Sequence, residues 1–250
     1  MAKKTGELLL EYYHPSGITT SIKEDRTAVT EADLAADSLI SESIRENFPE
    51  DGLLSEEANT IYPDDKSGVW VVDPLDGTTN FSLGLHYWGV SIARLIDGQP
   101  DTAALCFPML GELYTAQRGE GSYLNGTRLA AKSPDNNQPF TFFACCSRSH
   151  RRYDIKVRYK TRIIGSAAYG LTTVARGSAV LAFEVTPKIW DFSASWLVVQ
   201  EAGGVIQVLD GDPVYPLSPG VDYARNSFPI LAAATPELWS EGRSKIALKA

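Results

Sequence analysis

The chain has 250 residues, 44% of them hydrophobic, and its formal net charge is −8. This length and apolar content favour a globular protein with a substantial core and argue against a disordered chain. An acidic surface argues against general nucleic-acid binding, which needs a basic footprint. It does not exclude small anionic substrates, because a bound cation can reverse the local charge.

The cysteines and the apolar runs indicate in which compartment of the cell the protein is located. The chain has three cysteines, Cys106, Cys145 and Cys146. Because this number is odd and two of them are adjacent, no disulfide framework is suggested. No apolar run approaches the roughly 18 residues that a membrane span needs, and no secretory signal pattern is visible. We therefore expect a cytoplasmic protein that has no membrane partner.

The first elements along the chain are helical. A short helix is expected over residues 6–13. In residues 30–48, apolar or small residues recur at the spacing of one helix face. Thr30 is a suitable N-cap, and Asp33 follows three residues later, as in a capping box. Pro49 then marks the end of the helix.

Strand patterns follow from Val69 onward. Apolar or alternating runs cover residues 69–73, 87–96, 102–108 and 112–118, with turn residues between them. Asp97-Gly98 joins the second run to the third. A further hairpin is expected over residues 119–129, with Asn125-Gly126 as its tight turn. Together these runs predict a meander of mostly antiparallel strands.

The second half of the chain alternates between strands and helices. A polar, proline-containing segment at residues 132–139 is the predicted joint between two lobes. After it we expect strands at 140–145, 161–164, 179–185 and 204–209, and helices at 166–176, from Asp191 and after Pro236. This alternation is typical of an α/β unit. We therefore predict an α+β lobe over residues 1–135 and an α/β lobe over residues 136–250.

The stretch VWVVDPLDGTTNF, residues 69–81, joins a buried strand to two carboxylates in one turn. Asp73 and Asp76 repel each other there unless a cation lies between them. Hard cations such as Mg²⁺ prefer oxygen ligands, and the Leu75 carbonyl between the two aspartates adds one. A helix beginning at Thr78-Thr79 would leave free N–H groups, which bind phosphate. The turn can therefore hold a metal and a phosphate together.

An ordinary acidic turn after a strand is the alternative. Other acidic residues weigh against it: Asp33 in the long helix, the pair Glu56-Glu57 after an apolar stretch, and Asp191 at a strand-to-helix junction. Each is common alone, since Asp is a good helix cap and a Glu pair is usually solvated. Together they are the carboxylates that a site with several Mg²⁺ ions needs.

These motifs resemble the inositol monophosphatase family, within the lithium-sensitive, magnesium-dependent phosphatase superfamily. The matching stretches, in the family's order and spacing, are VTEAD at Thr30–Asp33, SEEA at Glu56-Glu57, DPLDGTTNF at Asp73–Phe81, IIGSAA at Gly165–Ala168, and WDFSASWLVVQEAGG at Trp190–Gly204. The resemblance covers nearly the whole chain. It implies a layered αβαβα sandwich of the inositol monophosphatase and fructose-1,6-bisphosphatase type, with the active site between two lobes.

The resemblance also implies the residues of the site. Two or three Mg²⁺ ions are expected, with Asp73 bridging two of them and Glu57 beside the ligands. The implied metal ligands are Glu56, Asp73, the Leu75 carbonyl, Asp76 and Asp191. The implied catalytic pair is Thr78 with Asp33, which orients and helps to deprotonate the attacking water. The implied substrate contacts are Asp76, Gly77, Thr78, Gly165, Ser166, Ala167, Glu184 and Asp191. Most metal ligands fall in the N-terminal lobe, and most contacts to the substrate alcohol in the C-terminal lobe.

The implied reaction is Mg²⁺-dependent hydrolysis of inositol monophosphate (myo-inositol 1-phosphate) or a similar sugar phosphate, by water. Fructose-1,6-bisphosphatase activity, 3′(2′),5′-bisphosphate nucleotidase activity and a catalytically inactive phospho-ligand binder are the alternatives. A small phosphorylated substrate, a homodimer and inhibition by lithium are expected by the same resemblance.

Two stretches depart from the family pattern. Phe192 and Trp196 replace small residues after Trp190-Asp191, so they could alter the packing of the lobes or the pocket wall. Residues 148–160 are strongly basic, with Arg148, Arg151, Arg152, Lys156, Arg158 and Lys160. They could form a solvated basic loop. Alternatively, one or two of them bind a second phosphate, which would favour fructose 1,6-bisphosphate or a nucleotide.

Overall fold

The computed structural model describes residues 1–18, 20–22, 28–134 and 141–249. Its helices are α1 (Ala2–Tyr12), α2 (Glu31–Asn47), α3 (Thr78–Ser82), α4 (Ser149–Arg152), α5 (Ala167–Ala175), α6 (Ile189–Glu201) and α7 (Pro236–Lys245), with short 3-10 turns η1 (Pro108–Leu110) and η2 (Tyr223–Arg225). In this described part of the chain, no helix combines the length and the apolar character that crossing a membrane requires.

A seven-stranded sheet carries the predicted meander. Its strands, in spatial order, are β3 (Gly52–Ser55), β4 (Gly68–Asp76), β5 (Gly89–Ile96), β6 (Gln99–Phe107), β7 (Glu112–Gln117), β8 (Gly121–Leu124) and β9 (Thr127–Arg128). Neighbours are antiparallel except the parallel pair β3 and β4. Asp97-Gly98 and Asn125-Gly126 make the expected tight turns, and these two central residues of each turn have positive φ.

A five-stranded sheet forms from the second half of the chain. Its spatial order is β12 (Lys160–Ile163), β10 (Phe142–Cys145), β13 (Ala179–Glu184), β15 (Ile230–Ala233) and β14 (Val205–Val208). The first three strands are parallel, and the last two pairings are antiparallel. The carboxyl ends of β10, β12 and β13 therefore meet at one edge, where ligands bind in open α/β sheets.

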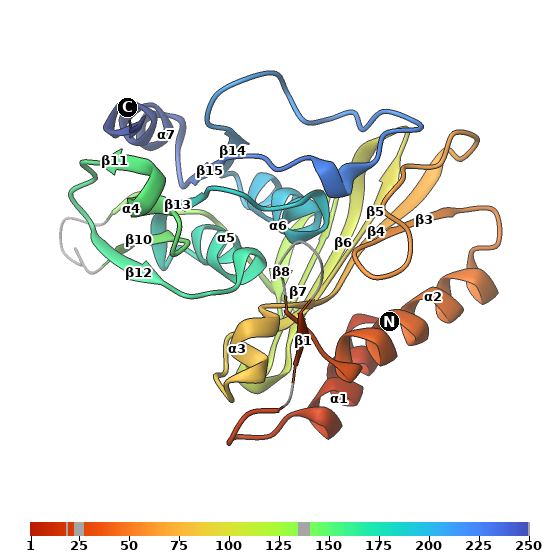
Figure 1. The fold of residues 1–250 in the computed structure, drawn as a ribbon. Coiled ribbons are helices and arrows are strands. Elements are labelled where there is room, and N and C mark those ends of the chain that lie inside the picture. Colours follow the sequence, from red (N-terminus) through yellow and green to blue (C-terminus); the bar gives the residue numbers. More distant parts are fainter. Residues whose placement is uncertain (19, 23–27, 135–140, 250) are drawn as a thin grey trace.

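Helices separate and cover the two sheets, as Figure 1 shows. α1 and α2 pack against β4, β5 and β6 on the outer face of the larger sheet. α6 contacts β4, β5 and β6 from the other side and also β14, while α5 packs on α6, β10 and β13. α7 covers β13 and β15. The predicted αβαβα layering is confirmed.

The long helix α2 begins as its sequence indicates. The Thr30 hydroxyl accepts hydrogen bonds from the amides of Ala32 and Asp33, while the Asp33 carboxylate accepts one from the Thr30 amide, which completes a capping box. α1 begins earlier than residue 6, at Ala2, and α6 begins at Ile189 rather than at Asp191. The latter shift places Asp191 inside the first turn of α6.

Several short elements were not predicted. They are the pair β1 (Ser21–Ile22) and β2 (Ala28–Val29), strand β3, helix α4, the interior strand β15, and the pair β11 (Tyr153–Ile155) and β16 (Ile246–Leu248). β11 and β16 lie far apart in the sequence, so no local pattern announces their pairing. The predicted joint at 132–139 lies partly outside the described residues. The proposed lobe boundary between residues 135 and 136 lies wholly outside them, so the division into lobes stays a prediction.

The two unexpected aromatic residues of α6 pack in the core. Phe192 is fully buried and Trp196 is 9% exposed. Their rings pack on each other, and both contact the ring of Tyr215. Neither residue lines the pocket described below. Both instead fill core space next to Tyr215, which lies in the long connection between β14 and β15.

Candidate metal and phosphate site

A pocket of about 340 Å³ lies at the ends of strands from both sheets. Residues from the larger sheet and α3 form one wall: Glu56, Asp73 and Leu75–Thr79. Residues from the smaller sheet and from the starts of α5 and α6 form the other: Cys146–Arg148, Gly165–Ala167, Glu184, Thr186, Pro187 and Asp191. The pocket therefore contains residues from every predicted motif except the long helix, whose Asp33 reaches it through Thr78.

The turn after β4 has the shape that its glycine permits. β4 is buried along its whole length, and Gly77 follows it with φ of 87° before α3 begins. A Cβ at Gly77 would lie 2.8 Å from the Tyr87 carbonyl oxygen, so a larger residue is excluded. The Leu75 amide donates to Asp73 Oδ1 at 3.0 Å, which holds that carboxylate within the turn.

Three carboxylates converge in this pocket. Glu56, Asp73 and Asp191 each offer an oxygen, and these atoms all lie within 4.8 Å of one another. The parallel pairing of β3 with β4 places Glu56 next to the end of β4. Asp191 is fixed in the first turn of α6, where it accepts a hydrogen bond from the Lys188 amide at 2.8 Å.

Burial and crowding disfavour negative charge on these groups. Burial, followed by repulsion from Glu56, raises the pKa of Asp73 well above its usual range, and the same two causes raise that of Asp191. Burial also raises the pKa of Asp76 to about 6, although the Ser166 hydroxyl opposes this shift by donating to the carboxylate. Carboxylates so placed are stabilised in the charged form by a cation.

The donors fit a hard divalent cation. All are oxygens, the ligand type that Mg²⁺ prefers, and Leu75, whose carbonyl lies 3.0 Å from the Thr78 hydroxyl, lines the pocket between Asp73 and Asp76. Among the residues that the structure describes, the metal-ligand cluster consists of carboxylates and not of the thiolates and imidazoles that bind structural zinc.

Thr78 connects the pocket to α2. Its hydroxyl lies 3.1 Å from Asp33 Oδ1 and 3.0 Å from the Leu75 carbonyl oxygen, and either atom can accept a hydrogen bond from it. Asp33 is buried, and its other oxygen accepts from the Thr30 amide at 2.7 Å and the Thr30 hydroxyl at 2.6 Å. The cap of α2 thus fixes the orientation of Asp33 toward Thr78.

The opposite wall contacts the turn through Asp76. This carboxylate accepts from the Ser166 hydroxyl and, at 3.1 Å, from the Ala167 amide at the start of α5. Gly165 has φ of 84°, and a Cβ there would lie 2.7 Å from Asn80 Oδ1. Glu184 ends β13, and burial followed by its proximity to Cys146 raises its pKa well above the usual range.

Some pocket residues were missed by sequence reasoning. Cys146, Ser147, Thr186 and Pro187 line the pocket, and Arg148 joins it from the basic segment. Each follows the carboxyl end of β10 or β13, so the parallel order of those strands would have indicated them. Glu57 was expected beside the metal ligands, and it lies next to the pocket residue Glu56 without lining the pocket itself.

Comparisons with known proteins agree with this arrangement. A model of the inositol monophosphatase family matches residues 1–240. The chain is 36% identical over 228 residues to the Nus factor SuhB of Escherichia coli (strain K12), covering 87% of this chain and 85% of that protein. It is 34% identical over 212 residues to a histidinol-phosphatase of Chlorobaculum parvum, covering 82% and 81%. The structure of an inositol monophosphatase from Anabaena (Nostoc) sp. PCC 7120 is similar with a TM-score of 0.74 at 26% identity, covering 97% and 91%.

Proposed function

Because this chain belongs to the inositol monophosphatase family, we propose that its carboxylate pocket hydrolyses the phosphate monoester of a small polyhydroxylated alcohol. The observation that carries the proposal is the convergence of Glu56, Asp73 and Asp191, with their oxygens within 4.8 Å, beside the Asp33–Thr78 pair. The coarse assignment, a phosphatase of this superfamily, follows from the family. The substrate and the role of each residue are part of the proposal.

Five groups would hold the metal. They are the carboxylates of Glu56, Asp73, Asp76 and Asp191 and the Leu75 carbonyl, all of which line the pocket. Two or three Mg²⁺ ions, when bound, would neutralise the phosphate charge, lower the pKa of a water molecule and stabilise the leaving alkoxide. Asp73, which the charges of Glu56, Asp76 and Asp191 all affect, would hold the metal together with these neighbours.

Asp33 and Thr78 would receive the proton of the attacking water. When the Thr78 hydroxyl donates to Asp33 Oδ1, 3.1 Å away, the lone pairs of its oxygen can accept a hydrogen bond from water. The bonds from Thr30 hold Asp33 as an oriented carboxylate. The pair therefore orients the water and provides a path for its proton.

The remaining residues would position the ester. The amides of Gly77 and Thr78, in the pocket wall, would donate to the phosphate oxygens. The alcohol would lie against the opposite wall and meet Asp76, Gly165, Ser166, Ala167, Glu184 and Asp191. These groups offer both donors and acceptors, which suits an alcohol with several hydroxyl groups.

Inositol 1-phosphate or a similar sugar phosphate is the proposed substrate. The family assignment and the polar pocket support it. A second candidate is fructose 1,6-bisphosphate or a 3′(2′),5′-bisphosphate nucleotide, which one observation favours: Arg148 lies in the pocket wall. A catalytically inactive binder is disfavoured, because every expected carboxylate and Thr78 are present.

Phosphate release by the purified protein, with and without Mg²⁺, tests the proposal. The substrates are inositol 1-phosphate, fructose 1,6-bisphosphate, adenosine 3′,5′-bisphosphate, histidinol phosphate and NADP. Hydrolysis that requires Mg²⁺ and is lost in Asp73→Asn is the expected result. Mg²⁺ binding without hydrolysis of any ester would instead identify a phospho-ligand binder.

Other expectations accompany this proposal. A homodimer, inhibition by lithium and a location in the cytoplasm remain predictions, and gel filtration with light scattering tests the first. The name Nus factor describes the Escherichia coli relative. The expected absence of a nucleic-acid partner likewise remains a prediction for this chain, and a binding assay with labelled RNA tests it.

A further inference from the structure

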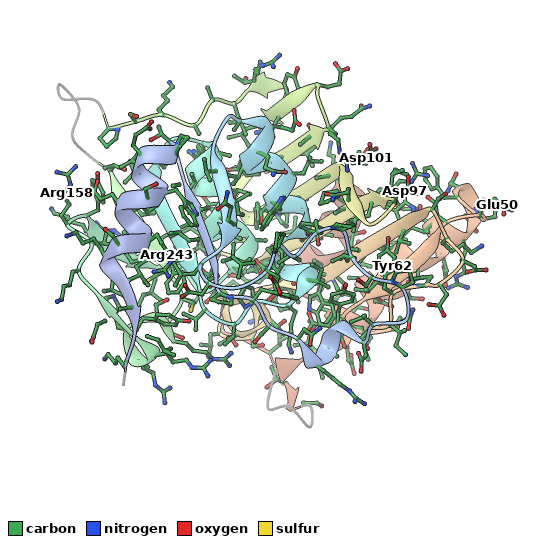
Figure 2. The ribbon with its side chains drawn as sticks, turned by 90° about the horizontal axis from the view of Figure 1, so that it is seen from above. Glu50, Tyr62, Asp97, Asp101, Arg158 and Arg243 are labelled. Carbon is green, nitrogen blue, oxygen red and sulfur yellow. The ribbon has the colours of Figure 1, made fainter. Side chains whose placement is uncertain are left out.

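The basic segment divides into two groups in the structure. Arg148, Arg151 and Arg152, together with Thr186, line a second pocket of about 380 Å³. Lys156, Arg158 and Lys160 do not line it. Figure 2 shows Arg158 at the edge of the molecule beside α7, where its guanidinium lies 3.7 Å from Glu241 and over the Tyr159 ring. The six cations of this segment are all exposed, and three of them gather around this pocket.

The second pocket adjoins the carboxylate pocket. Arg148 and Thr186 line both of them. Arg148 Nη1 donates to the Thr186 hydroxyl at 2.5 Å, so the side chain that separates the two pockets is oriented by a hydrogen bond. Thr186 follows Glu184, whose carboxylate lies in the first pocket. One ligand can thus extend from the carboxylate wall to the arginine wall.

The backbone that carries the arginines is fixed on both sides. Ser149 is buried at the start of α4, with its hydroxyl 3.3 Å from Cys146 Sγ. The Arg151 amide donates to the Arg148 carbonyl at 3.1 Å, and the Lys249 amide donates to the Arg152 carbonyl at 2.9 Å. The three guanidinium groups are therefore presented by a closed turn that is paired to the C-terminal strand.

The charge balance of these three arginines differs from that of other arginines in the described part of the chain. Among the described residues, Arg148, Arg151 and Arg152 form no ion pair with a carboxylate, whereas Arg158, Arg176 and Arg243 do. Like charges held in one short turn repel, and an anion relieves that repulsion. Guanidinium groups match the oxygens of a phosphate in geometry and in charge.

We propose that the Arg148–Arg151–Arg152 pocket binds a second phosphate of the substrate, while the scissile ester lies in the carboxylate pocket. This inference rests on the proposed metal-dependent phosphatase activity and favours the second candidate substrate over the first: a bisphosphorylated sugar or nucleoside would react in preference to inositol 1-phosphate. Arg148, which lines both pockets, determines specificity and takes no part in the chemical step.

Matched substrate pairs test this proposal. Fructose 1,6-bisphosphate is compared with fructose 1-phosphate, and adenosine 3′,5′-bisphosphate with adenosine 3′-phosphate, since each pair shares the scissile ester and differs by one phosphate. For at least one pair, we expect kcat/KM to be about tenfold or more higher for the bisphosphate, as charge-assisted hydrogen bonds allow. This ratio should fall as salt is added, because the arginines are exposed.

A double variant and a charge-matched control locate the effect. In Arg151→Gln/Arg152→Gln the ratio should fall toward one, whereas in Lys156→Gln/Lys160→Gln, which removes the same charge from the same segment, it should persist. A wild-type ratio near one for both pairs overturns the proposal. So does a ratio that survives the arginine changes, or one that falls equally in both variants.

A binding experiment separates this inference from the proposed function. Fructose 6-phosphate and adenosine 5′-phosphate carry the second phosphate without the scissile one, and calorimetry without Mg²⁺ measures their binding. Binding to wild type that is lost in Arg151→Gln/Arg152→Gln supports the arginine pocket even if no ester is hydrolysed. Equal binding of glucuronate overturns the assignment to phosphate, and the absence of binding in wild type overturns the pocket itself.

Discussion

The two walls of the pocket differ in how the chain builds them. One wall comes mainly from a single turn, Asp73–Thr78, with Glu56 supplied by the adjacent parallel strand β3. The other comes from the ends of β10, β12 and β13 and the starts of α5 and α6. The first wall is therefore set by local sequence. The second exists once distant strands have paired.

The two walls also differ in charge. The turn wall carries the buried carboxylates of Asp73 and Asp76, which repel each other, and this arrangement suits metal ions and the reacting phosphate. The opposite wall also contains two carboxyls, Glu184 and Asp191, but it adds hydroxyl and amide groups and, at its edge, Arg148. The comparison implies that changes in the first wall, or at Asp191, abolish the reaction, whereas other changes in the second wall alter which substrate reacts.

The largest effect is expected from Asp73→Asn. This substitution removes a carboxylate that would hold the metal, so kcat should fall by about a thousandfold or more. Circular dichroism should be unchanged, because asparagine has the same shape. Asp65→Asn, an exposed acid outside the pocket, is the control. Substantial turnover by Asp73→Asn would show that the first wall does not hold the catalytic metal.

Asp73→Asn should also distinguish an effect on the stability of the fold from an effect on metal binding. Without metal, replacement of a carboxyl whose charged form the crowded cluster disfavours should raise the free energy of unfolding by about 1 kcal/mol. Mg²⁺ should raise the Tm of wild type through binding to the folded state, but not that of Asp73→Asn. Calorimetry across Mg²⁺ concentrations measures both. Equal Mg²⁺ stabilisation of the two proteins would contradict the ligand assignment.

Thr78→Ala should have the next largest effect. The hydroxyl that bonds to Asp33 is lost, so kcat should fall by about a hundredfold or more, as loss of general-base assistance does. The Mg²⁺ concentration for half-maximal activity should change much less. Thr78→Ser keeps the hydroxyl and should recover most of the rate. An equal loss in both variants would assign Thr78 a packing role.

The sequence predicts the first wall better than the second, for a physical reason. The geometry of DPLDGTTNF can be predicted from its own residues, because Gly77 needs positive φ and Asp73 follows a buried strand pattern. The Thr30–Asp33 cap is equally local and was also predicted. The layered fold could be predicted because periodicity gives strands and helices, and the family resemblance gives their arrangement.

The features that could not be predicted depend on contacts between residues far apart in the sequence. Arg148 meets Thr186 because β10 pairs in parallel with β13, and no local pattern places these two residues together. The pairing of β11 with β16 joins the basic segment to the C-terminal strand in the same way. The role of Trp196 was also open, because its burial depends on Tyr215, which lies in a later loop.

A smaller effect is expected from Ser166→Ala in the second wall. The Ser166 hydroxyl donates to Asp76 and accepts from the Tyr169 amide at 3.1 Å, which caps α5. Stability should fall by about 1 kcal/mol from loss of the cap, and kcat/KM should fall about tenfold, mostly through KM. Thr235→Ala removes the matching cap of α7, far from the pocket, and should cost stability alone. If both variants lose activity equally, Ser166 acts through stability.

The smallest effect on activity is expected at Asp51, which lies outside both walls. Asp51 accepts from Arg94 Nε at 2.6 Å, from Arg94 Nη2 at 3.0 Å and from Trp70 Nε1 at 2.9 Å. The Arg94 guanidinium holds the pKa of Asp51 below its usual value. Asp51→Asn should therefore lower the free energy of unfolding at pH 7 by about 2 kcal/mol, with kcat unchanged.

The sign of this pKa shift fixes the pH dependence of stability. A carboxyl whose pKa is lowered by folding stabilises the protein above its unfolded pKa of about 4, and this contribution is lost as pH falls through the lower folded value. The difference between wild type and Asp51→Asn, measured by urea unfolding, should therefore shrink below about pH 4. Asp154→Asn, in an exposed pair 4.0 Å from Lys249, should show almost no difference at any pH. A constant difference for Asp51→Asn would show that packing, rather than charge, accounts for its effect. Unchanged kcat in this variant would show that loss of stability in the larger sheet does not by itself impair the pocket.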